Sequence, residues 1–188
     1  MATSELIILG IDPGTLVTGY GVIRKRGTAA TLVDAGAIRN PAGNSMPLRL
    51  KNIYLALCKV IEAWHPDEFA IETAFYSKNA QSALKIGHVR GVAILAGVLY
   101  EIPVTEYSPR EIKKAVTGSG AASKEQVQYM VMRLLQMHKA PKQLDVTDAL
   151  ATALCHAHRI GKPRGAFNDW KSFVEAHPER IFHITKKK

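Results

Sequence analysis

The chain has 188 residues, of which 47% are hydrophobic and 22% are charged. This balance predicts one globular domain with a substantial core and excludes wholesale disorder. The formal net charge of +9 favours a polyanionic partner, because Lys and Arg side chains bind phosphates and release counterions. Charge alone does not identify nucleic acid, since many basic proteins bind none.

Two further features concern the cellular compartment. Cys58 and Cys155 lie in apolar helical patterns and are interpreted as reduced packing residues, not as a disulfide or a zinc site. The apolar run Leu6–Ile11 is too short to span a membrane, and no basic segment precedes it as in a signal peptide. We therefore expect a cytoplasmic protein with no membrane association.

The first quarter of the chain predicts an antiparallel meander. Leu6–Ile11 is continuously apolar, as expected of a central strand buried on both faces. Two β-rich runs follow, Thr18–Arg26 and Thr31–Arg39, with a turn at Arg26-Gly27 between them. A helical pattern then begins at Pro47 and stops before Pro66.

The remainder of the core alternates strands and helices. Short strands are predicted at Phe69–Glu72 and Pro103–Tyr107, and helices at Ser77–Tyr100, Pro109–Val116, Lys124–Met137 and Leu144–Ile160. Ser123 and Gln126 fit a capping box at the start of the third of these helices. The order predicts an α/β fold with a mixed five-stranded sheet (three antiparallel strands plus two parallel) flanked by helices. With right-handed crossovers, the strand of Glu72 lies beside and parallel to that of Asp12.

The composition changes after Ile160, so we expect a domain over residues 1–160 and a basic tail over 161–188. The tail opens with the linker Gly161–Gly165 and ends in three lysines, Lys186–Lys188. Between them, apolar side chains at helical spacing predict a short amphipathic helix: Phe167, Trp170, Phe173 and Val174.

Four carboxylates stand at positions where acids are unusual. Asp12 ends an apolar strand, Glu72 ends another, and Asp145 and Asp148 share one face in the first turn of a helix. Taken singly, each has an ordinary explanation: a turn-forming Asp, a solvent-facing strand end, and compensation of the helix dipole. Taken together, the predicted sheet brings them to one edge, where ligands of such sheets bind.

Carboxylates gathered in this way repel one another, at roughly 1 to 4 kcal/mol for a pair ~4 Å apart, so either their pKa values rise or cations neutralise them. Hard oxygen ligands select Mg²⁺ or Mn²⁺ over zinc. Two such ions, about 3.5–4 Å apart, activate water and stabilise the leaving oxygen in phosphodiester hydrolysis. The pattern therefore favours metal-dependent hydrolysis of a phosphodiester.

Three motifs in order carry a resemblance to a known family. The first is Ile8–Gly14 continuing through Thr18–Ile23, and the last is Asp145–Ala151. The second comprises Ala70-Ile71-Glu72 with Phe75, Lys78-Asn79 and Ser82–Lys85. Together they resemble the RuvC family of bacterial crossover junction endodeoxyribonucleases, over about Leu6 to His158.

The resemblance implies an RNase H-like fold and a homodimer that resolves four-way (Holliday) junction DNA by paired, symmetric, Mg²⁺-dependent cuts. It implies that the four acids are catalytic metal ligands and that Lys113 and Lys124 bind DNA. It also suggests cooperation with a branch-migration complex, RuvA and RuvB. The tail beyond about Gly161 has no counterpart in the resemblance.

Some of these residues keep a second interpretation. Lys124, beside the Gly118-Ser119-Gly120 loop, is a phosphate ligand or a solvated lysine, and helical periodicity does not decide between Lys113 and Lys114. Phe75, or Tyr76 in its place, stacks on unpaired bases at the crossover or is a core aromatic.

Two groups of helical residues favour structural roles. His156 and His158 point to different faces of one helix, so they are a poor metal pair and are interpreted as structural or surface residues. Three glycines at 87, 91 and 97 weaken the long helix unless close packing compensates. Packing against the sheet is the first explanation, and a dimer contact is the second.

Other functions compete with the nuclease. The Gly10–Thr15 turn also resembles the phosphate-binding turn of actin-like kinases, which need two such domains, more than 188 residues supply. A shorter RNase H-like family proposed to process ribosomal RNA fits less well around Glu72 and Phe75. A module that holds junctions without cutting them requires a disabled acid, and all four acids are present.

Overall fold

A computed structural model describes residues 5–73 and 80–160. Five strands form one sheet in the order β3-β2-β1-β4-β5, with bounds β1 Glu5–Asp12, β2 Val17–Arg26, β3 Ala29–Arg39, β4 Glu68–Glu72 and β5 Val104–Tyr107. β1, β2 and β3 pair antiparallel, while β4 is parallel to both β1 and β5. The mixed sheet expected from the sequence is confirmed.

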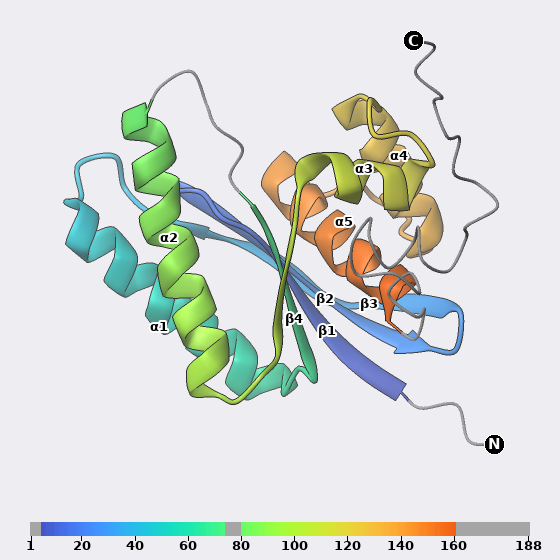
Figure 1. The fold of residues 1–188 in the computed structure, drawn as a ribbon, viewed down its shortest axis with the longest axis horizontal. Coiled ribbons are helices and arrows are strands. Elements are labelled where there is room, and N and C mark those ends of the chain that lie inside the picture. Colours follow the sequence, from blue (N-terminus) through green and yellow to red (C-terminus); the bar gives the residue numbers. More distant parts are fainter. Residues whose placement is uncertain (1–4, 74–79, 161–188) are drawn as a thin grey trace, which may run out of the picture. The chain divides into compact units, whose positions relative to one another are not determined.

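Helices cover both faces of this sheet (Figure 1). α1 (Met46–Trp64) and α2 (Ala80–Leu99) lie on one face, and α5 (Leu144–Arg159) lies on the other with α3 (Pro109–Thr117) and α4 (Lys124–Leu134) beside it. The sheet is therefore the middle of three layers, and its central strand β1 is buried on both faces, as its apolar sequence requires.

Alternation along the strands assigns each residue to a face. Leu9 and Ile11 of β1 belong to the buried cluster formed with α1 and α2, together with Phe69 and Ile71 of β4. The residues between them point the other way, toward α5. Asp12 therefore faces α5, and so do Glu68, Ala70 and Glu72.

α5 lies unusually close to β1 and β2. A Cβ at Gly10 would collide with the backbone oxygen of Ala149, and one at Gly19 with the backbone oxygen of Asp145. Gly19 lies opposite Asp12 in the β1–β2 ladder. Only residues without a side chain allow this approach, which brings the first turn of α5 to the end of β1.

Helix ends follow local chemistry. The capping box of Ser123 and Gln126 is present, and Ser108 with Glu111 forms a second one at the start of α3. α4 ends at Leu134, three residues before the predicted end, because Gln136 adopts a left-handed conformation with φ of 52°. The start predicted for α2, at Ser77, lies outside the described residues.

α2 is the one helix in the described ranges that is long and apolar enough to cross a bilayer by length and composition. Part of that apolar character is used within the fold, where Gly97 lies against Phe69 and Val104 of the sheet. Packing therefore explains Gly97. It does not explain Gly87 and Gly91, which are exposed and have open space where a Cβ would lie.

Candidate active site

The carboxyl ends of β1 and β4 bring two acids together. The parallel register pairs Gly10 with Ala70 and Ile11 with Ile71, so its next step places Asp12 beside Glu72. Both side chains face α5, and both are partly buried. Sixty residues separate them in sequence, and only the strand pairing makes them neighbours.

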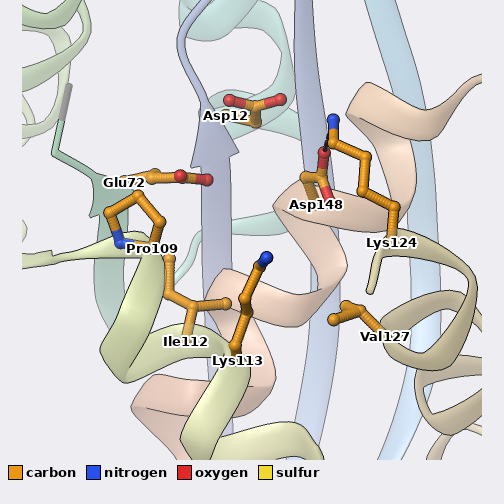
Figure 2. Close-up of a pocket in the computed structure, with 8 residues that line it drawn as sticks. All are labelled: Asp12, Glu72, Pro109, Ile112, Lys113, Lys124, Val127 and Asp148. Atoms are coloured by element: carbon orange, nitrogen blue, oxygen red, sulfur yellow. Dashed lines mark hydrogen bonds and ion pairs between the residues drawn. The ribbon is translucent and has the colours of Figure 1, made fainter. Parts of the chain in front are cut away.

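The first turn of α5 supplies the other two acids. Asp145 and Asp148 are partly buried, and the close approach at Gly19 sets this turn against the end of the sheet. Figure 2 shows the carboxylates of Asp12, Glu72 and Asp148 around one cavity. Three elements distant in sequence thus contribute one acid each to one place.

This cavity has a volume of about 270 Å³. Acidic and basic side chains share its lining with apolar ones from α3 and α4: Asp12, Glu72, Pro109, Ile112, Lys113, Lys124, Val127 and Asp148. The apolar wall at Ile112 and Val127 lowers the local polarity and so strengthens the electrostatic interactions of the acids.

Both strand-end acids hold protons more tightly than usual. Burial raises the pKa of Asp12 to about 8, and the neighbouring charges of Glu72, Asp148 and Asp145 add to this effect. Burial also raises the pKa of Glu72 to about 7, with Asp148 as the largest charge contribution. The positive charge of Lys124 lowers the pKa of both acids and so partly offsets these effects. Without a cation, these two acids are therefore stabilised in the protonated form, because the protein surroundings would neutralise their negative charge only in part.

Two lysines lie at the cavity. The Lys124 ammonium is 3.3 Å from the Asp148 carboxylate, and that charge raises the pKa of Lys124. Lys113 also lines the cavity, whereas Lys114 is exposed and is not among the lining residues. The structure thus places both lysines expected from the sequence at the acids.

The gathering of acids is incomplete in one respect. Asp145 does not line the cavity, although its charge raises the pKa of Asp12. Within the described part of the chain, no three His, Cys, Asp or Glu side chains stand close enough to grip one metal ion together. Phe75 and Tyr76, the expected base-stacking residues, lie outside the described residues.

The loop after Asp12 is fixed by residues that sequence reasoning missed. The fully buried Thr18 hydroxyl donates to the Gly14 carbonyl at 2.6 Å. The Asn40 backbone N–H donates to the Leu16 carbonyl at 2.8 Å, and its side chain donates to the Thr15 carbonyl at 3.2 Å. Thr18 lies in β2 and Asn40 directly follows β3, and only their burial reveals this role.

Comparisons with known proteins agree with this architecture. A family model described as crossover junction endodeoxyribonuclease RuvC matches residues 8–156. A protein of that name from Cytophaga hutchinsonii is 43% identical over 185 residues, covering 98% of this chain and 92% of its own. The relative from Bacteroides fragilis is 45% identical over 181 residues, covering 94% and 96%.

Solved structures are similar as well. Thermus thermophilus RuvC in complex with Holliday junction substrate is 31% identical, with a TM-score of 0.77 over 81% of this chain and 93% of its own. A yeast mitochondrial Holliday junction resolvase has a TM-score of 0.57 at 12% identity over 80% of this chain and 78% of its own, which shows a shared fold.

The fold is therefore RNase H-like, and the class of protein is an endodeoxyribonuclease. The chain belongs to the RuvC family of crossover junction endodeoxyribonucleases. Members of this family are metal-dependent nucleases that act in recombination and repair. The family resemblance of the three sequence motifs is confirmed.

Proposed function

We propose that this chain resolves Holliday junctions and that Asp12, Glu72, Asp145 and Asp148 are its catalytic metal ligands. The observation that carries the proposal is the convergence of Asp12, Glu72 and Asp148 on one cavity, where the pKa values of Asp12 and Glu72 are raised. The fold alone would not require acids there. Partly buried acids with unbalanced charge are unfavourable in a protein unless a cation binds them.

The donor set fits a hard divalent cation. Its ligands are all carboxylate oxygens, the kind that Mg²⁺ and Mn²⁺ prefer, and we propose two Mg²⁺ ions with Mn²⁺ as a substitute. When bound, such ions supply a nucleophilic water and stabilise the leaving oxygen of the phosphodiester. In the described residues no three of these acids are grouped closely enough to hold one ion together, so the proposal requires their side chains to come closer together in the metal-bound state.

The protein's own residues then have separate tasks. The acids fix the place of attack, and the apolar wall of Ile112 and Val127 limits the water that reaches it. Lys113 and Lys124 bind the phosphates on either side of the cut, since their ammonium groups lie at the cavity. The pairing of Lys124 with Asp148 keeps that lysine oriented before DNA arrives.

The substrate is four-way junction DNA, because the Thermus thermophilus relative was solved with a Holliday junction substrate. Phe75, or Tyr76, stacks on bases that the enzyme holds unpaired at the crossover. Such stacking stabilises each splayed base by ~1–3 kcal/mol.

Symmetric cutting requires two copies of the site, and α2 offers a surface for a second copy of the chain. Leu84, Leu95 and Val98 are 65%, 51% and 56% exposed. With the exposed Gly87 and Gly91 they follow helical spacing along one side of α2, called here the α2 stripe. Exposed apolar stripes of this kind mark protein interfaces, and the two glycines let a partner helix approach closely.

The remaining assignments come from the composition of the chain and, for RuvA and RuvB, from the family. We propose that residues 1–160 form the nuclease domain and 161–188 a basic tail, that the enzyme works in the cytoplasm, and that the homodimer acts with RuvA and RuvB. None of these assignments is needed for the chemistry of the acidic cavity.

The deciding experiment is cleavage of a synthetic four-way junction with limited mobility, with and without Mg²⁺, mapped on all four strands. We expect paired nicks on opposing strands in Mg²⁺, and Asp12→Asn should abolish them while junction binding stays intact or tightens. Asp67→Asn is the control, because Asp67 directly precedes β4 at the opposite end of the strand from Glu72. The amide oxygen of asparagine can still accept the hydrogen bond from the Ile7 N–H. Nicking by Asp12→Asn, or preferential cleavage of structured RNA, would overturn the proposal.

A further inference from the structure

A buried histidine connects α5 to the strands beside the acids. His156 lies two turns beyond Asp148 and is 4% exposed. Its Nδ1 is 2.8 Å from the Tyr107 hydroxyl, and its Nε2 is 3.2 Å from a Glu68 carboxylate oxygen. The ring also packs edge-on against Tyr107, with centroids 5.7 Å apart. One side chain of α5 thus contacts both β4 and β5.

The hydrogen bonds define how this ring is protonated. A carboxylate only accepts, so Nε2–H donates to Glu68, which leaves Nδ1 to accept from the Tyr107 hydroxyl. This is a neutral imidazole with both nitrogens satisfied. Burial lowers the pKa of His156, against the opposing influence of Glu68, so the neutral form persists at neutral pH.

Tyr107 also holds the end of β4. It is the strand partner of Glu72 in the β4–β5 ladder. Its carbonyl accepts two hydrogen bonds from Thr73, one from the backbone N–H at 2.8 Å and one from the hydroxyl at 3.2 Å. Thr73 directly follows Glu72, so this double contact fixes the backbone that carries the acid.

The contacts form a closed circuit. It runs from Glu68 at the start of β4 through His156 of α5 and Tyr107 of β5 to Thr73 at the end of β4. Inside the circuit lies the strand segment that ends in Glu72, and α5 carries Asp145 and Asp148. Apolar side chains of similar size could fill this space with less desolvation, so the polar groups require a reason beyond packing.

We propose that Thr73, Tyr107 and His156 are positioning residues that hold Glu72 in register with the Asp145–Asp148 turn. This rests on the proposed function, in which those acids bind metal together. Because the acids must converge on a cation, an error in the placement of β4 against α5 weakens metal binding. The circuit determines the distance between the two halves of the site while touching neither substrate nor metal.

Two conservative substitutions in the full chain test the circuit. Thr73→Val removes the hydroxyl while keeping the shape of the side chain. Thr73→Ser keeps the hydroxyl and is the matched control. Tyr107→Phe removes the hydroxyl that His156 accepts from. The measurements are Mg²⁺ binding by calorimetry, the Mg²⁺ dependence of junction nicking, junction binding in EDTA, and thermal unfolding in EDTA.

We expect Thr73→Val and Tyr107→Phe to weaken Mg²⁺ binding, on the order of 10-fold. Nicking should recover at saturating Mg²⁺, junction binding in EDTA should match the wild type, and Thr73→Ser should behave as wild type. Wild-type Mg²⁺ binding in both variants with only a lower unfolding temperature would assign the circuit to stability. Failure of both variants to fold would also assign it to stability and overturn the proposal.

Glu72→Gln separates this inference from the proposed function. If Glu72→Gln binds Mg²⁺ as tightly as the wild type, Glu72 is not a metal ligand and the proposed function is wrong for that residue. If Glu72→Gln weakens Mg²⁺ binding while Thr73→Val and Tyr107→Phe do not, only the positioning role is wrong.

Discussion

Gly19 of β2 touches the backbone oxygen of Asp145 so closely that a Cβ at this position would collide with it. Gly19 is also the ladder partner of Asp12, so the close approach of α5 to β2 at this point brings its acidic turn next to the end of β1. The candidate site therefore depends on a residue that carries no functional group.

Gly19→Ala should push α5 away from the sheet. Overpacking of this kind costs about 1–3 kcal/mol, and because backbone is the obstacle we expect a lower unfolding temperature together with loss of nicking. Gly43→Ala is the control, since nothing lies within 4 Å of a Cβ there. Thermal unfolding and junction cleavage measure both effects, and an active Gly19→Ala would show that α5 can shift without harm.

Asp12→Asn should stabilise the protein without metal, and more so at alkaline pH. The folded pKa of Asp12 is about 8, whereas an unfolded Asp ionises near its ordinary value of 3.8. Between these values the folded state keeps a proton that the unfolded state releases, so the free energy of unfolding falls as pH rises through this window. Asparagine does not ionise and escapes this loss.

Calorimetry in EDTA at about pH 5 and about pH 8.5 tests this sign. The gain in unfolding temperature from Asp12→Asn should be larger at the higher pH, and saturating Mg²⁺ should stabilise the wild type more than the variant. An equal gain at both values would mean that the ionisation of Asp12 is not linked to folding.

Lys124→Ala should weaken junction binding and reduce its salt dependence by about one unit of slope, because one phosphate contact is lost. Lys114→Ala is the matched control, since Lys114 is exposed and is not among the residues that line the cavity. Binding titrations over a range of salt concentrations supply the slope. The same slope in Lys124→Ala and wild type would show that Lys124 is a solvated surface lysine and not a phosphate ligand.

Phe75→Ala should leave a folded protein with poor turnover, since an aromatic ring that splays bases contributes to catalysis and not to the core. Turnover of the junction and the unfolding temperature distinguish the two interpretations, with Tyr76→Ala as the comparison. A marked loss of thermal stability would favour the core interpretation of Phe75.

Leu95→Glu should convert the proposed dimer to monomers, because it places a charge within the α2 stripe. Leu48→Glu on α1, which is 55% exposed, controls for the loss of an exposed leucine. Analytical ultracentrifugation gives the oligomeric state. Leu95→Glu that remains dimeric would place the interface elsewhere.

The sequence was sufficient for the order of elements and for the convergence of acids from β1 and β4. Periodicity and strand ends carry that information locally, and the crossover rule adds the neighbour relation between Asp12 and Glu72. Helical periodicity did not decide between Lys113 and Lys114, because the answer depends on where α3 sits over the sheet.

Other features depend on tertiary register and were not foreseen. The partner of His156 is Tyr107, 49 residues away, and the role of Gly19 depends on a helix 126 residues later. The sheet packing expected of Gly87 and Gly91 was wrong, because small residues on a helix have the same appearance in sequence whether they face a sheet or an open surface.

The order of the elements in the chain determines the stage of synthesis at which all four acids are present. Asp12 and Glu72 leave the ribosome early, but α5 is the last element of the described core and brings Asp145 and Asp148. If the four acids act together as proposed, a nascent chain that stops before Leu144 holds only half of them and has no complete site. In that case the nuclease is completed only when the last helix of the described core has been made.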